Sequence, residues 1–217
     1  LKIDAEHQLS ATYEGGTVAW KSSSDKVSVV DGKVTINGYP EGGKATITAY
    51  DASDETINAS VEISVEAMTL TPSSSDVVVG DTVKYSSNYN NAVIQSGTGY
   101  SVSENEITAE SEGNHTVTAN AGNASATATI NVSKLAITGG SSTMDTGANV
   151  DFNVNGQTEG HTFAWTSSDP TILSIDESTG EAQALKSGKV KVTVKKDGKY
   201  TSDEFSVTVQ KGALSIS

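Results

Sequence analysis

The sequence contains no cysteine and no arginine, and only three prolines and two methionines among its 217 residues. Without cysteine a disulfide framework is excluded, so each folded unit depends on its apolar core alone. All 14 basic residues are lysines, and they are outnumbered by 27 carboxylates, which gives a formal net charge of −13. This acidic balance disfavours binding to nucleic acid or to an anionic membrane, since both attract basic patches.

The sequence also lacks long apolar runs. None approaches the roughly 20 residues that a membrane-spanning helix needs, so we expect no membrane insertion. The amino-terminal residues 1–4 turn polar too early for a signal peptide, and any targeting segment was removed or lies outside these residues. Thr, Ser, Val, Ala and Gly dominate instead, and β-branched residues suit strands. The hydrophobic share is only 35%, but apolar residues alternate with polar ones, which argues against disorder.

One motif, a glycine followed by an alternating strand, occurs three times. The copies begin at Gly43, Gly113 and Gly188, with spacings of 70 and 75 residues. A second landmark keeps the same register, because Trp20 and Trp165 each lie 23 residues before the glycine of their copy. A tryptophan and a glycine that keep the same spacing in two copies indicate a true repeat of small β-domains.

Each copy closes with a further alternating strand, and turn residues separate the strands. The turns are clearest in the third copy, where Asp197-Gly198 is a hairpin signal. We place domains at residues 1–66, 67–133 and 134–210, and residues 211–217 resemble the start of a further unit. The first copy lacks the opening strand seen at 68–70 and 135–137. Because the links between units are short, we expect a stiff, elongated array of about 100 Å.

The third copy resembles the group 2 bacterial immunoglobulin-like domain. The resemblance rests on Trp165-x-Ser-Ser-Asp, the strand 172–175, Gly180 and Gly188, followed by an alternating strand. The first copy matches from Leu9 onward with one extra serine. The middle copy keeps Val79-Gly80-Asp81 but has no tryptophan, and its assignment rests on the spacing. The resemblance implies an all-β fold of three tandem immunoglobulin-like β-sandwich domains in an elongated rod, with spacer or contact roles.

The tryptophans could be ligand-stacking aromatics, but a core role is the stronger interpretation. A small sandwich needs a large apolar side chain, and burying one removes about 200 Å² from water. We expect both to fill their cores from a central strand. The predicted core residues are Trp20, Trp165, Ile47, Val117 and Val192.

No motif in the sequence predicts catalysis. The Ser-Ser-Asp that follows Trp165 suggests a nucleophile and an acid, but such residues more often cap turns by binding backbone amides. The three histidines, His7, His115 and His161, lie in different copies, whereas a hydrolase needs a base beside its nucleophile. We therefore expect no enzyme, no catalytic residues and no cofactor-binding or metal-binding residues.

Calcium is the one ligand whose binding the acidic loops make possible. The segments 51–55 and 203–204 could hold Ca²⁺, although no EF-hand-like spacing is present. A solvated acidic surface is the simpler interpretation. Lys189 and Lys191 indicate an edge strand protected against pairing, which favours a monomer.

Three functions fit these observations. The first is a phage virion appendage, decoration or fibre protein that contacts the host surface. The second is a stalk of a bacterial adhesin of the intimin and invasin kind, and the third is a carbohydrate-binding appendage of a secreted enzyme. The expected partners are other domains of a longer parent chain and a host cell-surface glycan or protein. The expected location is the virion surface or the bacterial cell surface.

Overall fold

The structure is a computed structural model that describes residues 1–212, and in that range it is all-β apart from one 3-10 turn at Glu41–Gly43. The described strands form six sheets, which pair into three β-sandwich domains. No helix within residues 1–212 has the length and apolar character to cross a membrane. The chain divides into two compact units. Unit 1 comprises Leu1–Pro72, Tyr85–Gln95 and Thr116–Ala128, and unit 2 comprises Ser73–Lys84, Ser96–His115 and Thr129–Ser217.

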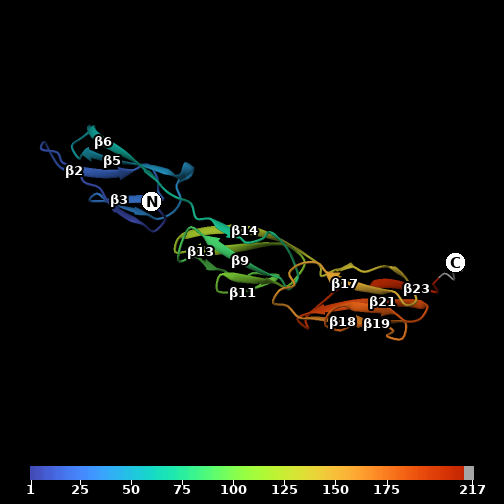
Figure 1. Cartoon of the computed structure of the whole chain (residues 1–217). Coiled ribbons are helices and arrows are strands. Elements are labelled where there is room, and N and C mark those ends of the chain that lie inside the picture. Colours follow the sequence, from blue (N-terminus) through green and yellow to red (C-terminus); the bar gives the residue numbers. More distant parts are fainter. Residues whose placement is uncertain (213–217) are drawn as a thin grey trace. The chain divides into compact units, whose positions relative to one another are not determined.

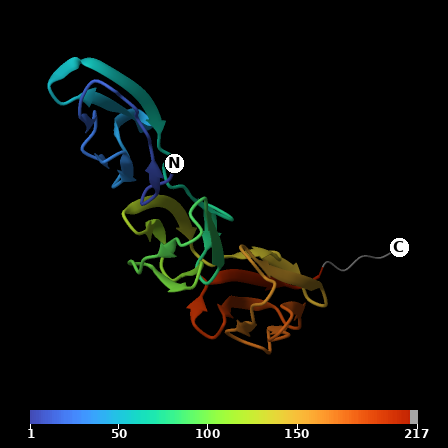
Figure 2. The same ribbon diagram turned by 90° about the vertical axis from the view of Figure 1, so that its left-hand side faces the viewer.

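The first sandwich lies in unit 1 and consists of two three-stranded sheets, in the orders β1-β4-β3 and β2-β5-β6. Figures 1 and 2 show the long hairpin β5–β6 on one side of this sandwich and β3 on the other. The bounds are β1 Glu6–Gln8, β2 Val18–Ser22, β3 Val27–Val30, β4 Lys33–Ile36, β5 Lys44–Asp51 and β6 Asp54–Ser64.

Alternation along these strands builds the first core. In β5 every second residue points inward, so that Ala45 and Ile47 are buried while Lys44 is exposed. Val34 and Ile36 of β4 face them from the other sheet and are fully buried. The apolar period of two therefore places one face of each sheet in the core.

The second sandwich contains two four-stranded sheets, in the orders β10-β13-β14-β8 and β11-β12-β9-β7, and its residues are divided between the two units. Strand β8 pairs in parallel with the end of β14. The bounds are β7 Leu70–Pro72, β8 Asp76–Val78, β9 Thr82–Ser87, β10 Val93–Ile94, β11 Tyr100–Ser103, β12 Glu106–Ala109, β13 Gly113–Ala121 and β14 Ala124–Ser133.

The third sandwich lies in unit 2 and has the sheet orders β15-β17-β20-β19 and β16-β23-β21-β18, with β22 also paired to β21. Figure 1 labels β17, β18, β19, β21 and β23 of this sandwich, whose buried core includes Phe152 and Trp165. The predicted hairpin lies between β21 and β22, where Asp197 and Gly198 both have positive φ. The bounds are β15 Ile137–Gly139, β16 Thr143–Asp145, β17 Asn149–Val154, β18 Phe163–Ser167, β19 Leu173–Ile175, β20 Glu181–Ala184, β21 Gly188–Lys196, β22 Tyr200–Thr201 and β23 Phe205–Gln210.

The same backbone bend recurs two residues before β1, β9 and β17. It lies at Asp4, Gly80 and Gly147, with φ of 65°, 85° and 89°. Glycine adopts this left-handed region freely, and aspartate is among the few other residues that tolerate it. In every case the amide of the bend residue donates to the end of a strand, namely to the carbonyls of Ile36 (2.7 Å), Ala109 (2.7 Å) and Ala184 (2.8 Å).

Two expectations about strand positions are wrong. Lys189 and Lys191 do not lie on an edge, because their strand β21 pairs with β23 on one side and β18 on the other. Trp20 and Trp165 do not lie on central strands, since β2 and β18 each end their sheet. The alternation of apolar and polar residues along a strand predicts which face of the sheet each side chain lies on. It does not predict which strands are neighbours, because that depends on pairing between segments that are distant in sequence.

Candidate functional site

The three histidines that suggested chemistry lie in three different sandwiches. His7 is exposed on β1, the His115 ring bonds the carbonyl of Ser111 at 2.8 Å, and His161 pairs with Asp197. Within residues 1–212 no group of three or more histidine or acidic side chains is placed to hold a metal ion. The acidic loop at 51–55 uses its carboxylates locally, as the Asp51 Oδ1 atom accepts from the amide and hydroxyl of Ser53.

The Ser-Ser-Asp element caps a turn, as predicted. The Asp169 Oδ1 atom accepts bonds from the amide and the hydroxyl of Thr171, at 2.9 and 2.7 Å. The Ser168 hydroxyl accepts from the amide of Lys191 at 3.0 Å, which ties the turn to β21. In the first sandwich the Ser23 hydroxyl accepts from the amide of Thr46 at 2.9 Å in the same way. These groups bind backbone and are not arranged for nucleophilic attack.

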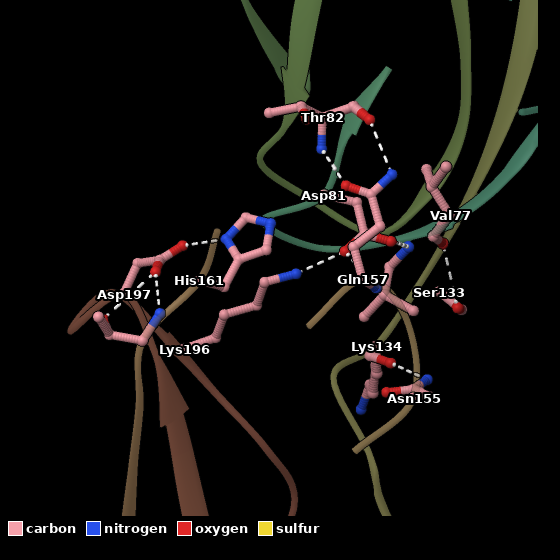
Figure 3. Close-up of polar contacts among 12 residues, drawn as sticks. Val77, Asp81, Thr82, Ser133, Lys134, Asn155, Gln157, His161, Lys196 and Asp197 are labelled. Carbon is pink, nitrogen blue, oxygen red and sulfur yellow. Dashed lines mark hydrogen bonds and ion pairs between the residues drawn. The ribbon is translucent and has the colours of Figure 1, made fainter. Parts of the chain in front are cut away.

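The most enclosed polar contact in unit 2 joins the second and third sandwiches. The Lys196 Nζ atom, from the end of β21, lies 2.5 Å from the Asp81 Oδ1 atom, at the bend before β9. The two side chains are 0% and 2% exposed. Figure 3 shows the lysine extended toward this carboxylate. Charges this deeply buried require both a partner and further hydrogen bonds.

Backbone amides from both sandwiches supply those further bonds to Asp81. The Oδ2 atom accepts from the amide of Val78 at 2.9 Å, and the Oδ1 atom accepts from the amide of Gln157 at 3.0 Å. The Gln157 carboxamide in turn donates to the carbonyl of Thr82 and accepts from its amide, at 3.0 and 3.2 Å. Figure 3 shows this two-point contact above the ion pair. The carboxylate is therefore held from three directions.

Glycines allow the two backbones to come this close. A Cβ atom at Gly156 would lie 2.7 Å from the Cβ of Val78, and one at Gly80 would lie 2.7 Å from the Tyr200 ring. Both glycines have positive φ, so a side chain would be strained as well as crowded. Val78 is 5% exposed and belongs to the apolar cluster of the third sandwich. The junction thus combines an apolar contact with the ion pair.

Two further polar contacts, Lys199–Glu110 and His161–Asp197, flank the buried ion pair. The Lys199 ammonium donates to Glu110 at 3.0 Å, which lowers the pKa of Glu110 and raises that of Lys199. Burial acts to raise the pKa of Asp197, but bonds from the Thr162 amide and the His161 ring outweigh it, so this pKa lies below its ordinary value. The His161 side chain is 10% exposed.

A second polar junction lies in unit 1, between the first sandwich and a part of the second. The Tyr89 hydroxyl accepts from the amide of Ile3 at 2.8 Å and donates to the carbonyl of Glu66 at 2.9 Å. The Lys2 ammonium lies over the Tyr89 ring, 5.0 Å from its centroid, and donates to the carbonyl of Asn88. No buried ion pair is found among the described residues of this junction.

The two linkers are held by asparagines 67 residues apart. The Asn88 side chain accepts from the amide of Thr69 and donates to the carbonyl of Ala67, at 2.8 and 2.9 Å. The Asn155 side chain accepts from the amide of Ala136 and donates to the carbonyl of Lys134, at 2.7 and 2.9 Å. We call these two residues the linker asparagines. Sequence reasoning missed them, although each lies 21 residues after the linker residue to which it donates.

Four of the five predicted core residues are almost completely enclosed. Ile47, Val117 and Val192 are 1%, 0% and 0% exposed, and Trp165 is 5% exposed. Trp20 differs, because it is only half-buried. The structure brings Trp165 and Val192 into one cluster and leaves the others in their own sandwiches.

Comparison with known proteins identifies one part of the chain. Residues 131–209 match the family described as Bacterial Ig-like domain (group 2). A 45-residue stretch, 21% of this chain, is 56% identical to the polysaccharide lyase 8 family protein HylA of Enterococcus faecalis (strain ATCC 700802 / V583). The stretch covers only 3% of the length of that protein.

Among solved structures, similar chains include the I9–I11 tandem from titin, with 16% identity, a TM-score of 0.37, and coverage of 97% of this chain and 95% of that one. Domains 1–6 of the surface layer protein SbsC give 14% identity, a TM-score of 0.29, and coverage of 99% and 39%. Invasin, a bacterial integrin-binding protein, gives 15% identity, a TM-score of 0.30, and coverage of 90% and 52%.

Proposed function

We propose that this chain is a non-catalytic spacer of a bacterial surface protein, in which neighbouring sandwiches are held together across short linkers. The observation that carries the proposal is the Asp81–Lys196 ion pair, whose two charges lie 115 residues apart in sequence and are both buried. A free hinge would leave these charges in water. Their burial requires one particular arrangement of the second and third sandwiches.

The buried Asp81–Lys196 pair favours one arrangement of the two sandwiches more than it increases the net free energy of unfolding. Desolvation offsets most of the attraction within a buried pair, but removing one partner strands the other charge at a cost of about 3–5 kcal/mol. Arrangements that separate Asp81 from Lys196 must also give up the bonds of Gln157 to Thr82. We infer that the third sandwich and the part of the second sandwich that lies in unit 2 move as one body, as a spacer needs.

The bacterial surface is supported by the family matched at 131–209, which is described as bacterial. The sequence led us to place a phage virion first and a bacterial adhesin stalk second. We now place the bacterial surface protein first, because the matched family is described as bacterial. The tandem arrangement of three copies is part of this proposal, supported by the bend shared by Asp4, Gly80 and Gly147.

A second candidate function is an appendage of a polysaccharide-active enzyme. It is favoured by the 45-residue relative, a protein named as a polysaccharide lyase. In this case the chain would bind carbohydrate itself. A glycan array with the full chain tests the idea, and the absence of any retained polysaccharide at millimolar concentration would exclude it.

Backbone ¹⁵N relaxation on the full chain tests the coupling of the second and third sandwiches. In the wild type, residues 73–84 and 134–210 should share one rotational correlation time. In Asp81→Ala the stranded lysine should open the junction, so that the two sets of amides relax with different correlation times. Glu204→Ala is the matched control, because its ion pair with Lys191 is equally short but 55–57% exposed. Independent tumbling in the wild type, or unchanged coupling in folded Asp81→Ala, would refute the proposal.

A further inference from the structure

In the second and third sandwiches an early strand lies in parallel beside the last strand. Strand β8 pairs with the end of β14, where Val77 lies opposite Val132, and β16 pairs with β23, where Met144 lies opposite Val209. Both strands of a parallel pair run the same way. Tension along the chain would therefore draw the early strand toward its own beginning and the last strand toward its own end, so that the hydrogen bonds between them are loaded together in shear.

Hydrogen bonds at both ends hold the ladder between β8 and β14. The Asn131 amide donates to the Ser75 carbonyl at 2.7 Å, and the Val79 amide donates to the Ser133 carbonyl at 3.0 Å. The Ser133 hydroxyl also donates to the Val77 carbonyl at 3.2 Å (Figure 3). The ladder of the third sandwich has matching end bonds, from the Thr208 amide to the Ser142 carbonyl and from the Thr146 amide to the Gln210 carbonyl, at 2.8 and 2.9 Å. Residues 213–217, and with them most of the predicted further unit at 211–217, lie outside the described residues.

The end of β8 is anchored in the third sandwich. Val78, its last residue, belongs to the apolar cluster of that sandwich, and Asp81 pairs with Lys196. Tension would pull β8 away from these contacts, whereas β14 leads through Ser133 directly into the third sandwich. A shift of β8 by one residue would move Asp81 by about 3.3 Å, which is enough to break its contact with the lysine. The ion pair therefore resists this shift together with the ladder.

The other two sandwiches have alanine in the place of Asp81. Ala5, Asp81 and Ala148 each follow the bend residue of their sandwich directly. In each case the amide donates to the carbonyl three residues earlier, at 3.1, 2.9 and 3.0 Å. This turn therefore forms without a carboxylate. We attribute the aspartate at position 81 to its contact with the buried Lys196.

We propose that the third sandwich is a mechanical lock on β8, so that the second sandwich resists tension along the chain fully only while its junction with the third is closed. Resistance to force depends on the barrier to unfolding, and contacts that must break before β8 can slide raise this barrier. The proposal deepens the spacer function and rests on it, because a spacer between two attached bodies transmits the force between them.

Pulling the full chain by its two ends in optical tweezers tests the lock. The third sandwich, residues 134–210, is about ten residues longer than the second, residues 67–133, so their unfolding steps differ by about 35 Å of extended chain. At constant force, the second sandwich of the wild type should unfold about tenfold or more slowly while the third is folded than after the third has unfolded. Equal rates in these two situations would overturn the proposal.

Lys196→Met changes a residue of the third sandwich, but the lock predicts an effect on the second. The unfolding rate of the second sandwich, scored in traces in which the third is still folded, should rise about tenfold or more. Lys191→Met, on the same strand, is the matched control, because its ion pair with Glu204 is 55–57% exposed. It should leave this rate unchanged. Asp81→Ala should act as Lys196→Met does, and it introduces the residue that the other two sandwiches have at this place.

The relaxation measurement separates failure of the lock from failure of the spacer. If Asp81→Ala uncouples residues 73–84 from 134–210 but leaves the unfolding rate of the second sandwich unchanged, the spacer stands and the lock is refuted. Independent tumbling in the wild type would refute both. An equal rise in the unfolding rate in Lys196→Met and Lys191→Met would also overturn the lock, because the effect would then not depend on the buried pair.

Discussion

At the scale of residues, Trp165 is a buried aromatic side chain in the core of the third sandwich. Its ring lies 6.1 Å from that of Phe152, which in turn meets Phe205 edge-on at 5.7 Å. Removing a buried tryptophan costs about 3–5 kcal/mol, which is comparable to the whole stability of a small domain. We expect Trp165→Ala to abolish the cooperative melting of the third sandwich, measured by near-ultraviolet circular dichroism.

Trp20→Ala is the control for that experiment. Trp20 is half-buried, and smaller residues, Leu9 and Val61, occupy the positions of Phe152 and Phe205. The loss should therefore be smaller than for Trp165. A Trp165→Ala protein that still melts cooperatively would contradict the core assignment.

We expect Asp176 to contribute to the acid sensitivity of the third sandwich. Bonds from the Ser178 hydroxyl and from the amides of Thr179 and Ser178 lower the pKa of Asp176 from its ordinary 3.8 to about 2. Because the folded-state pKa is depressed, the carboxylate stabilises the fold above pH ~4, and this contribution is lost as the pH falls from ~4 to ~2. In Asp176→Asn the melting temperature of the third sandwich should change less steeply across this range. An unchanged slope would show that Asp176 is not the group responsible.

At the scale of elements, the linker asparagines hold the backbone of the two linkers in a fixed conformation. Each replaces the hydrogen bonds that the linker backbone would otherwise make with water. We expect Asn155→Ala to cost about 1 kcal/mol and to increase the hydrogen-exchange rate of the Ala136 amide by about fivefold or more. Asn153→Ala, at an exposed position in β17 two residues before Asn155, is the control. Equal exchange rates in both variants would show that the linker is ordered by other contacts.

At the scale of the whole molecule, the elongated rod expected from the sequence remains a prediction. Short linkers and three units of 30–40 Å lead us to expect a maximum dimension of about 100 Å in small-angle X-ray scattering. A compact globule of this length would have a radius of gyration of only about 17 Å. A dilution series should precede the measurement, because any self-association would lengthen the particle. A radius near the compact value would refute the rod.

The sequence by itself determined the all-β class and most of the strands. Alternation with a period of two and turn residues such as Asp197-Gly198 are local properties, so they can be read without knowing the fold. The repeat of Gly43, Gly113 and Gly188 also placed the strands of the three copies in a common register.

Only the tertiary structure decided which distant residues meet. Asp81 and Lys196 read as ordinary surface charges in sequence, yet both are buried against each other. Trp20 and Trp165 share one motif, but their burial differs because their neighbours come from other strands. The physical reason is that the alternation of apolar and polar residues assigns each side chain only to a face of its own sheet. The chemistry of a junction depends on which residues of the other sheet or sandwich lie against that face.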